Sequence, residues 1–147
     1  MNALVTPRAD ATGQNKAAQV VEASLADGRP VVRRVVCAAD VGTVVHPGIV
    51  AQQMESAIVF GLSAALYGEC TVKNGRIEQD NFHTYPVMRM AQMPRVETIV
   101  MPSGGFWGGV GEPTIAVAAP AVLNAIFAAT GRRIRTLPLK DQNLKRA

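Results

Sequence analysis

The fold is decided by residues 31–67, VVRRVVCAADVGTVVHPGIVAQQMESAIVFGLSAALY. Residues 31–39 are rich in β-branched valine and predict a strand. Pro47 stands where a helix can begin, because its fixed backbone angle suits a first helical turn. Residues 49–67 then predict a helix that is apolar nearly all round and therefore buried on most sides. Gly68 is expected to be its C-cap.

Further elements are expected on both sides of this stretch. They are strands at 20–25, 69–72, 96–101 and 133–137, an irregular segment at 79–94 and a helix at 121–130. The turn dipeptides Asp27-Gly28 and Asn74-Gly75 predict hairpins. Pro120 is placed in the first turn of the second helix, and Gly131 just beyond its end. This order predicts an α+β fold in which β-hairpins pack with two buried helices.

The composition fits one folded domain. Hydrophobic residues make up 48% of the 147 residues, and charged residues only 18%. A chain with so little charge has much to bury, either in its own core or against a partner. The domain is predicted at 17–139, after a polar, flexible leader at 1–16 and before a basic tail at 140–147.

Several functional classes are disfavoured by the same sequence. The net charge of +4 raises the question of nucleic-acid binding, but aromatic residues are only 5%, and six of the fifteen Lys and Arg residues lie between Arg132 and Arg146. That pattern favours a solvated basic tail over a binding stripe. Neither the two histidines nor the two cysteines have metal-ligand spacing, so no metal site of the chain's own is expected. The leader lacks the apolar core of a signal peptide, and no membrane-length apolar run is uninterrupted, so a cytoplasmic location is expected.

Glu112 is the first candidate for chemistry. It follows Gly109, Val110 and Gly111 in residues 102–113, the glycine segment, of which five of twelve residues are glycine. Glycines let a backbone approach a ligand closely. A carboxylate at the edge of an apolar helix is expected to be poorly solvated, which raises its pKa and suits a general base. A surface glutamate in a flexible loop explains the same pattern, and the segment lacks the signatures of a P-loop or a dinucleotide fold.

The second candidate is the polar cluster of Gln52, Gln53 and Glu55 at the start of the first helix. Free backbone N–H groups point outward at a helix start, so amides there can bind a polar cofactor. By pattern alone, amides that satisfy the preceding loop are the simpler interpretation.

Five motifs stand in one order along the chain: RRVVCAADVGTVVHP at 33–47, AQQMESAIVFGLSAALYGE at 51–69, NFHTYP at 81–86, GVGEP at 109–113 and AIFAATG at 125–131. Together they resemble the final region of the molybdopterin-binding large subunits of the xanthine dehydrogenase and aldehyde oxidase family. The resemblance covers about residues 17–139. Three positions depart from the family pattern: Ser56-Ala57 replaces Gly-Gly, His46-Pro47 replaces Asn-Pro, and Gly104-Gly105-Phe106-Trp107 replaces an acidic, proline-rich segment.

This resemblance implies a role for each candidate. The family's large subunit holds molybdenum on a molybdopterin cytosine dinucleotide, and its glutamate, here Glu112, takes a proton from a hydroxide ligand of the metal. Gln53 matches a glutamine near the pterin, and Gly109, Val110 and Gly111 belong to the motif beside the cofactor. The reaction implied is oxidative hydroxylation of N-heteroaromatic compounds or aldehydes, with water as the oxygen source.

The resemblance also implies partners. Only the end of the family's large subunit is matched, so the rest of that subunit and a small [2Fe-2S] subunit are expected to be needed, and the isolated chain is expected to be inactive. A non-catalytic remnant, or an interaction domain that keeps the fold, is the alternative.

Overall fold

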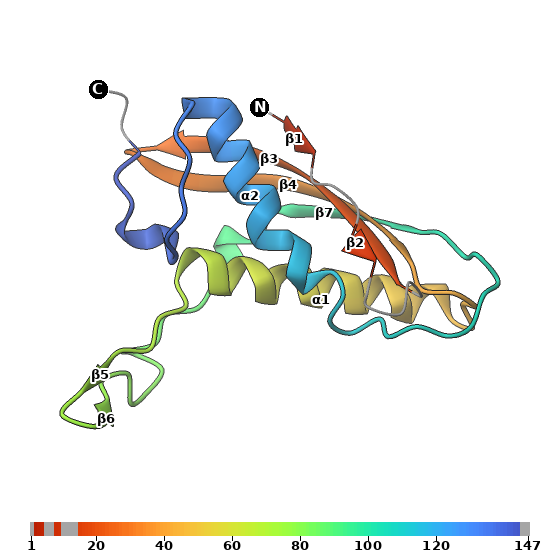
Figure 1. Ribbon diagram of the computed structural model, residues 1–147, viewed down its shortest axis with the longest axis horizontal. Helices are drawn as coiled ribbons and strands as arrows, with labels where there is room; N and C mark the ends of the chain where they lie inside the picture. Colours follow the sequence, from red (N-terminus) through yellow and green to blue (C-terminus); the bar gives the residue numbers. More distant parts are fainter. Residues whose placement is uncertain (1, 5–7, 10–14, 145–147) are drawn as a thin grey trace.

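The computed structural model describes residues 2–4, 8–9 and 15–144. Figure 1 shows a twisted sheet with two helices packed against it and a small hairpin that projects beyond the end of the first helix. The elements are β1 (Asn2–Leu4), β2 (Arg8–Ala9), β3 (Lys16–Ala26), β4 (Arg29–Asp40), α1 (Pro47–Leu66), β5 (Val72–Lys73), β6 (Arg76–Ile77), η1 (Met90–Gln92), β7 (Arg95–Val100), α2 (Ile115–Thr130) and η2 (Leu139–Asp141). The α+β fold with two helices is confirmed.

The β3–β4 hairpin forms the centre of the sheet. Its turn is Asp27-Gly28, where both residues have positive φ, 52° and 79°, as a tight hairpin turn requires. The strand order is β1-β3-β4-β7, with β2 also on β3. β7 runs parallel to β4, so the chain must cross over between them, and α1 lies within that crossover.

Both helices cover one face of this sheet. Along β3 and β4, alternate residues are buried, and they join the core with Met54, Ile58 and Leu62 of α1 and Val122 and Ile126 of α2. α1 begins at Pro47 as predicted, with the His46 side chain accepting a hydrogen bond from the Ile49 N–H at 3.2 Å. The C-cap is Tyr67 rather than Gly68.

The prediction that α1 is buried on most sides is wrong. Its outer face is open: Ile49 is 52% exposed and Phe60 is 69% exposed. By length and composition alone α1 could cross a membrane, a property shared with the core helices of soluble proteins. Here its inner face packs against α2 and the sheet.

α2 starts six residues before the predicted position. Pro120 lies inside the helix, not in its first turn. It is tolerated because it lies on the exposed side of α2, where the carbonyl that loses its partner can face water. Gly131 ends the helix with φ 69°, and its N–H donates to Phe127 O at 2.7 Å, as predicted.

Two predicted strands also need correction. Residues 133–137 form no strand, and of the strand predicted at 69–72 only Val72 is in one, paired with Ile77 in a small hairpin. The Asn74-Gly75 turn of that hairpin is confirmed, with φ of 51° and 75°. This hairpin has few residues and both its strands are exposed, so local turn chemistry defines it more than packing does.

The predicted domain limits can be compared with the packing. Much of the predicted leader, 1–16, lies outside the described residues; where it is described, β1 and β2 pair with β3. Beyond residue 139 the core continues, because Leu144 is 1% exposed and its N–H donates to Gly28 O at 2.9 Å. Lys140 pairs with Glu69 at 2.7 Å. Within the predicted basic tail, packing therefore extends at least to Leu144.

Candidate functional site

The segment between β7 and α2 carries Glu112 and is fastened to the end of β4. In Figure 1 it runs around the N-terminal end of α1 before turning back to α2. The Met101 N–H donates to Ala39 O at 2.9 Å, and the Gly108 N–H to Val41 O at 3.0 Å. Between them, Thr43 donates to Gly105 O from its N–H, at 3.1 Å, and from its hydroxyl, at 2.8 Å. Residues 101–108 thus extend the sheet's hydrogen bonding past the end of the regular strands.

The Asp40-Val41-Gly42 corner makes this fastening possible. Gly42 has φ 80°, and a Cβ at this position would overlap the backbone of Phe106, so no other residue fits the close approach. Asp40 accepts a hydrogen bond from the Gly42 N–H at 3.0 Å. That bond, with hydrogen bonds from Ser103, lowers the pKa of Asp40. The corner is part of a matched motif, but the sequence did not reveal its contact with the glycine segment.

Gly108 has an equally local explanation. A Cβ there would overlap the side chain of Asn15, which is 7% exposed. The sequence suggested that glycines in this segment make room for a ligand. Gly108, like Gly42 opposite the segment, makes room for the protein itself, whereas the close neighbour of Gly111 is a predicted site residue.

Gln53 and the glycine segment are brought together. A Cβ on Gly111 would lie 3.6 Å from Gln53 Oε1. Gln53, Gly109, Gly111 and Glu112 are all exposed, and Val110 is half-buried against the core. The five predicted residues therefore come from one small region where the first turns of α1 meet the segment before α2. Apart from Val110, they are exposed on the surface of the chain.

The surroundings of Glu112 differ from the expectation. Its side chain is exposed, so the poor solvation predicted for a carboxylate at the edge of an apolar helix is wrong for this chain. Its backbone is nevertheless well held, because Glu112 O accepts the Ile115 N–H at 2.9 Å. This bond closes the turn that leads into α2.

A buried amide under this turn was missed at the sequence level. Gln19 of β3 is 1% exposed, and its Nε2 donates to Thr114 O at 2.8 Å. Within the described part of the chain, Gln19 Oε1 and Thr114 Oγ1 have no hydrogen-bond partner. Each such buried atom costs about 1–3 kcal/mol. The signal that could have found Gln19 is the period-2 alternation of β3, which places it on the core face between Ala17 and Val21.

Cys37 lies opposite Gln19 on β4. Burial raises the pKa of the Cys37 thiol to about 11, and the Gln19 side chain opposes that shift by hydrogen bonding. Cys37 is therefore a protonated, inert core residue at neutral pH.

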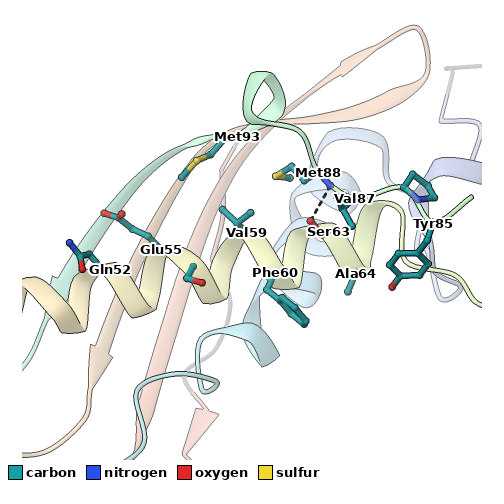
Figure 2. A pocket seen from close by; sticks show the side chains of 12 residues that line it. Gln52, Glu55, Val59, Phe60, Ser63, Ala64, Tyr85, Val87, Met88 and Met93 are labelled. Atoms are coloured by element: carbon teal, nitrogen blue, oxygen red, sulfur yellow. Dashed lines mark hydrogen bonds between the residues drawn. The ribbon is translucent and has the colours of Figure 1, made fainter. Parts of the chain in front are cut away.

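A groove of a different kind lies along the outer side of α1. It has a volume of about 570 Å³ and lies between α1 and residues 85–93. Figure 2 shows Val59, Phe60, Met88 and Met93 around it, with the Met88 N–H donating to the Ser63 hydroxyl at 3.1 Å. Gln52 and Glu55 line this groove, so the predicted polar cluster is divided: Gln53 faces the glycine segment and its neighbours face the groove.

No grouping of His, Cys, Asp and Glu able to hold a metal ion occurs among residues 2–4, 8–9 and 15–144.

Comparison with known proteins gives the family. The model of the molybdopterin cofactor-binding domain matches residues 6–94, more than half of the chain. The chain therefore belongs to the molybdopterin cofactor-binding domain family. The matched range includes Gln53 and ends before the glycine segment.

Individual relatives agree with this assignment. The chain is 40% identical over 109 residues to isoquinoline 1-oxidoreductase subunit beta of Brevundimonas diminuta, covering 74% of this chain and 14% of that protein. It is 37% identical over 107 residues to membrane-bound aldehyde dehydrogenase (pyrroloquinoline-quinone) of Gluconacetobacter polyoxogenes, covering 73% and 14%. The predicted resemblance to molybdenum hydroxylase large subunits is confirmed, and the chain spans only 14% of the length of these two relatives.

Solved structures share the fold. The aldehyde oxidoreductase of Desulfovibrio desulfuricans superposes with a TM-score of 0.71 at 24% identity, over 85% of this chain and 14% of that one. At this identity the likeness concerns the fold alone, and the matched part is a small share of a much larger chain.

Proposed function

We propose that this chain forms one side of the molybdenum cofactor site in a molybdenum hydroxylase large subunit and carries its general base. The observation that carries the proposal is the meeting of Gln53 with Gly111, one residue before Glu112. The reaction is oxidative hydroxylation of an N-heteroaromatic compound or an aldehyde. The rest of the large subunit and a small [2Fe-2S] subunit are the partners, and the isolated chain is inactive.

The residues present suit a polar cofactor. Gln53 offers an exposed amide that can both donate and accept hydrogen bonds. Next to it, Gly109 and Gly111 are exposed and carry no side chain to obstruct approach to the backbone. We propose that these groups hold the molybdopterin, in its cytosine dinucleotide form, along one side. A dinucleotide is large and needs a pocket lined from several sides, so other walls must come from outside these residues.

Glu112 has the role of general base. When bound, the cofactor supplies the molybdenum that activates the oxygen nucleophile and accepts the electrons. Glu112 accepts the proton that this chemistry releases. The hydrogen bond from the Ile115 N–H to the Glu112 carbonyl oxygen holds the backbone from which the carboxylate extends. Partner surfaces over Glu112 would exclude water and strengthen its electrostatic contacts.

The decisive experiment is co-expression of the chain with the missing part of a large subunit and a small subunit. Turnover of isoquinoline and aldehydes and molybdenum content are measured together. Glu112→Gln should keep the metal and lose about 10²–10⁴-fold in turnover, the usual contribution of a positioned base. Glu78→Gln is the matched control, because it is the same chemical change in the segment beside the β5–β6 hairpin, far from the glycine segment (Figure 1).

Three results would contradict the proposal. Near-wild-type turnover of Glu112→Gln at equal metal loading would show that Glu112 is not the general base. A correctly assembled complex without molybdenum would favour a non-catalytic remnant or an interaction domain that keeps the fold. Conversely, stoichiometric molybdenum and turnover in the isolated chain would show that no further walls are needed.

A further inference from the structure

Gln19 is a polar side chain at a buried position among apolar neighbours. It occupies the core-facing side of β3, directly between Ala17, 3% exposed, and Val21, 0% exposed. A methionine or leucine would fill such a position without burying polar atoms. What Gln19 adds is a directed bond of 2.8 Å to Thr114 O, which joins residues 95 positions apart in sequence.

That bond reaches the turn that carries Glu112. Thr114 is the N-cap of α2, and the Ile115 N–H beside it donates to Glu112 O at 2.9 Å. On the other side of Glu112, the Gly108 N–H is bonded to Val41 O at 3.0 Å. Residues 109–113 therefore bridge two fixed points, one on the end of β4 and the other on β3 through Gln19.

The amide contributes more to geometry than to stability. Gln19 Oε1 has no hydrogen-bond partner in the portion of the chain that is described, so part of the cost of burying the amide is not recovered. A half-satisfied amide is a poor source of stability, but a hydrogen bond to a carbonyl restrains direction as well as distance. Apolar packing alone is non-directional and would not supply this restraint.

We infer that Gln19 is a positioning residue for Glu112, acting through Thr114. The inference rests on the proposed function for its meaning in catalysis, but the restraint itself belongs to this chain and can be measured without any cofactor.

The test uses the full chain and three variants. Gln19→Met keeps length and apolar packing but cannot donate. Gln19→Glu donates to Thr114 O only while the new carboxyl is protonated. Val21→Ala is the control, because it weakens the same face of β3 and leaves the Gln19 bond to Thr114 O in place. The readouts are hydrogen exchange of the Ile115 amide relative to core amides of α1, global unfolding in urea, and time-resolved anisotropy of Trp107, the chain's single tryptophan.

Gln19→Met should lower the protection of the Ile115 amide on the order of tenfold relative to α1, the equivalent of about one neutral hydrogen bond, and increase the mobility of Trp107. Val21→Ala should lower global stability but leave the ratio between Ile115 and α1 unchanged. In Gln19→Glu, protection should approach the wild-type value at low pH. It should be lost as pH rises through the pKa of the new carboxyl, which burial raises.

Unchanged relative protection in Gln19→Met, or equal loss in Val21→Ala, would overturn the inference. If Gln19→Met fails to fold, the pH dependence of Ile115 amide protection in Gln19→Glu becomes the test. Protection that does not change with pH would contradict the inference. In the reconstituted complex, Gln19→Met should lower kcat with little change in KM or metal content. Full activity of Glu112→Gln would refute the proposed base and leave the exchange result standing, so the two failures are distinguishable.

Discussion

Gly61→Ala tests the crossing of the two helices on which the site depends. A Cβ on Gly61 would lie 2.7 Å from the Ala118 Cβ and 2.9 Å from Ile115 O. Carbon atoms in good contact are about 3.5–4.0 Å apart, and a helix carbonyl cannot rotate away as a flexible side chain can. The helices must therefore separate by roughly 1 Å to recover normal contact.

The expected loss follows from two opposing effects. Inserting a methyl group into a packed contact typically costs about 1–3 kcal/mol. Alanine in place of glycine inside a helix returns about 0.5–1 kcal/mol. Taken at the middle of each range, the two effects should lower the free energy of unfolding by roughly 1 kcal/mol. At this chain length each kcal/mol corresponds to about 2–4 °C in Tm.

The assay is urea unfolding followed by far-ultraviolet circular dichroism. Ala64→Gly, at an exposed position of α1, measures the helix-propensity effect in the same helix and should cost about 0.5–1 kcal/mol. A Gly61→Ala protein as stable as wild type, or more stable, would show that α1 and α2 do not approach this closely. Because Ile115 also bonds to Glu112 O, the same variant should displace Glu112 and lower turnover in an assembled enzyme.

Three further outcomes are expected. Alkylation of the folded chain near neutral pH should modify exposed Cys70 and spare buried Cys37, whose pKa is raised to about 11 by burial; mass spectrometry should find one adduct when folded and two after denaturation, and two adducts on the folded chain would contradict the burial. Arg34 lowers the pKa of Glu97 mainly through their side-chain hydrogen bonds. The pair's contribution to stability is therefore present above the ordinary glutamate pKa of 4.5 and is lost as pH falls through the lowered value. Arg34→Gln should make the free energy of unfolding less dependent on pH in this range, and parallel curves for the variant and the wild type would refute the assignment. Thr114→Val removes a buried hydroxyl that has no partner among the residues described, and should leave stability unchanged or raise it by up to about 1 kcal/mol, whereas a large loss in urea unfolding would reveal an unrecognised bond.

Local chemistry in the sequence predicted much of the fold. The Asp27-Gly28 and Asn74-Gly75 turns were predictable because positive φ at both positions selects those residues. The start of α1 at Pro47 was predictable for a similar reason. The parallel pairing of β7 with β4 was not, because nothing within a six-residue strand says which neighbour it will join.

The site was predictable in its parts and not in its arrangement. Glu112 and Gln53 were singled out by their motifs, but their proximity depends on how α1 meets the segment before α2. Gln19 and the Asp40 corner were missed because their roles depend on partners far along the chain, Thr114 and Ser103. Long-range bonds of this kind leave little trace in local periodicity.

In the proposed site, the position of Glu112 and the burial of its carboxylate have different origins. The chain itself fixes the backbone on both sides of Glu112, through Val41 and Gln19. It does not bury the carboxylate, which is exposed. Apolar side chains stand uncovered around the same region, with Phe106 75% and Trp107 65% exposed. A partner surface that covered these rings would gain apolar burial and, in the same step, remove water from Glu112. Assembly would then be what converts a well-placed surface carboxylate into a base, which is why activity is expected of the complex and not of the chain alone.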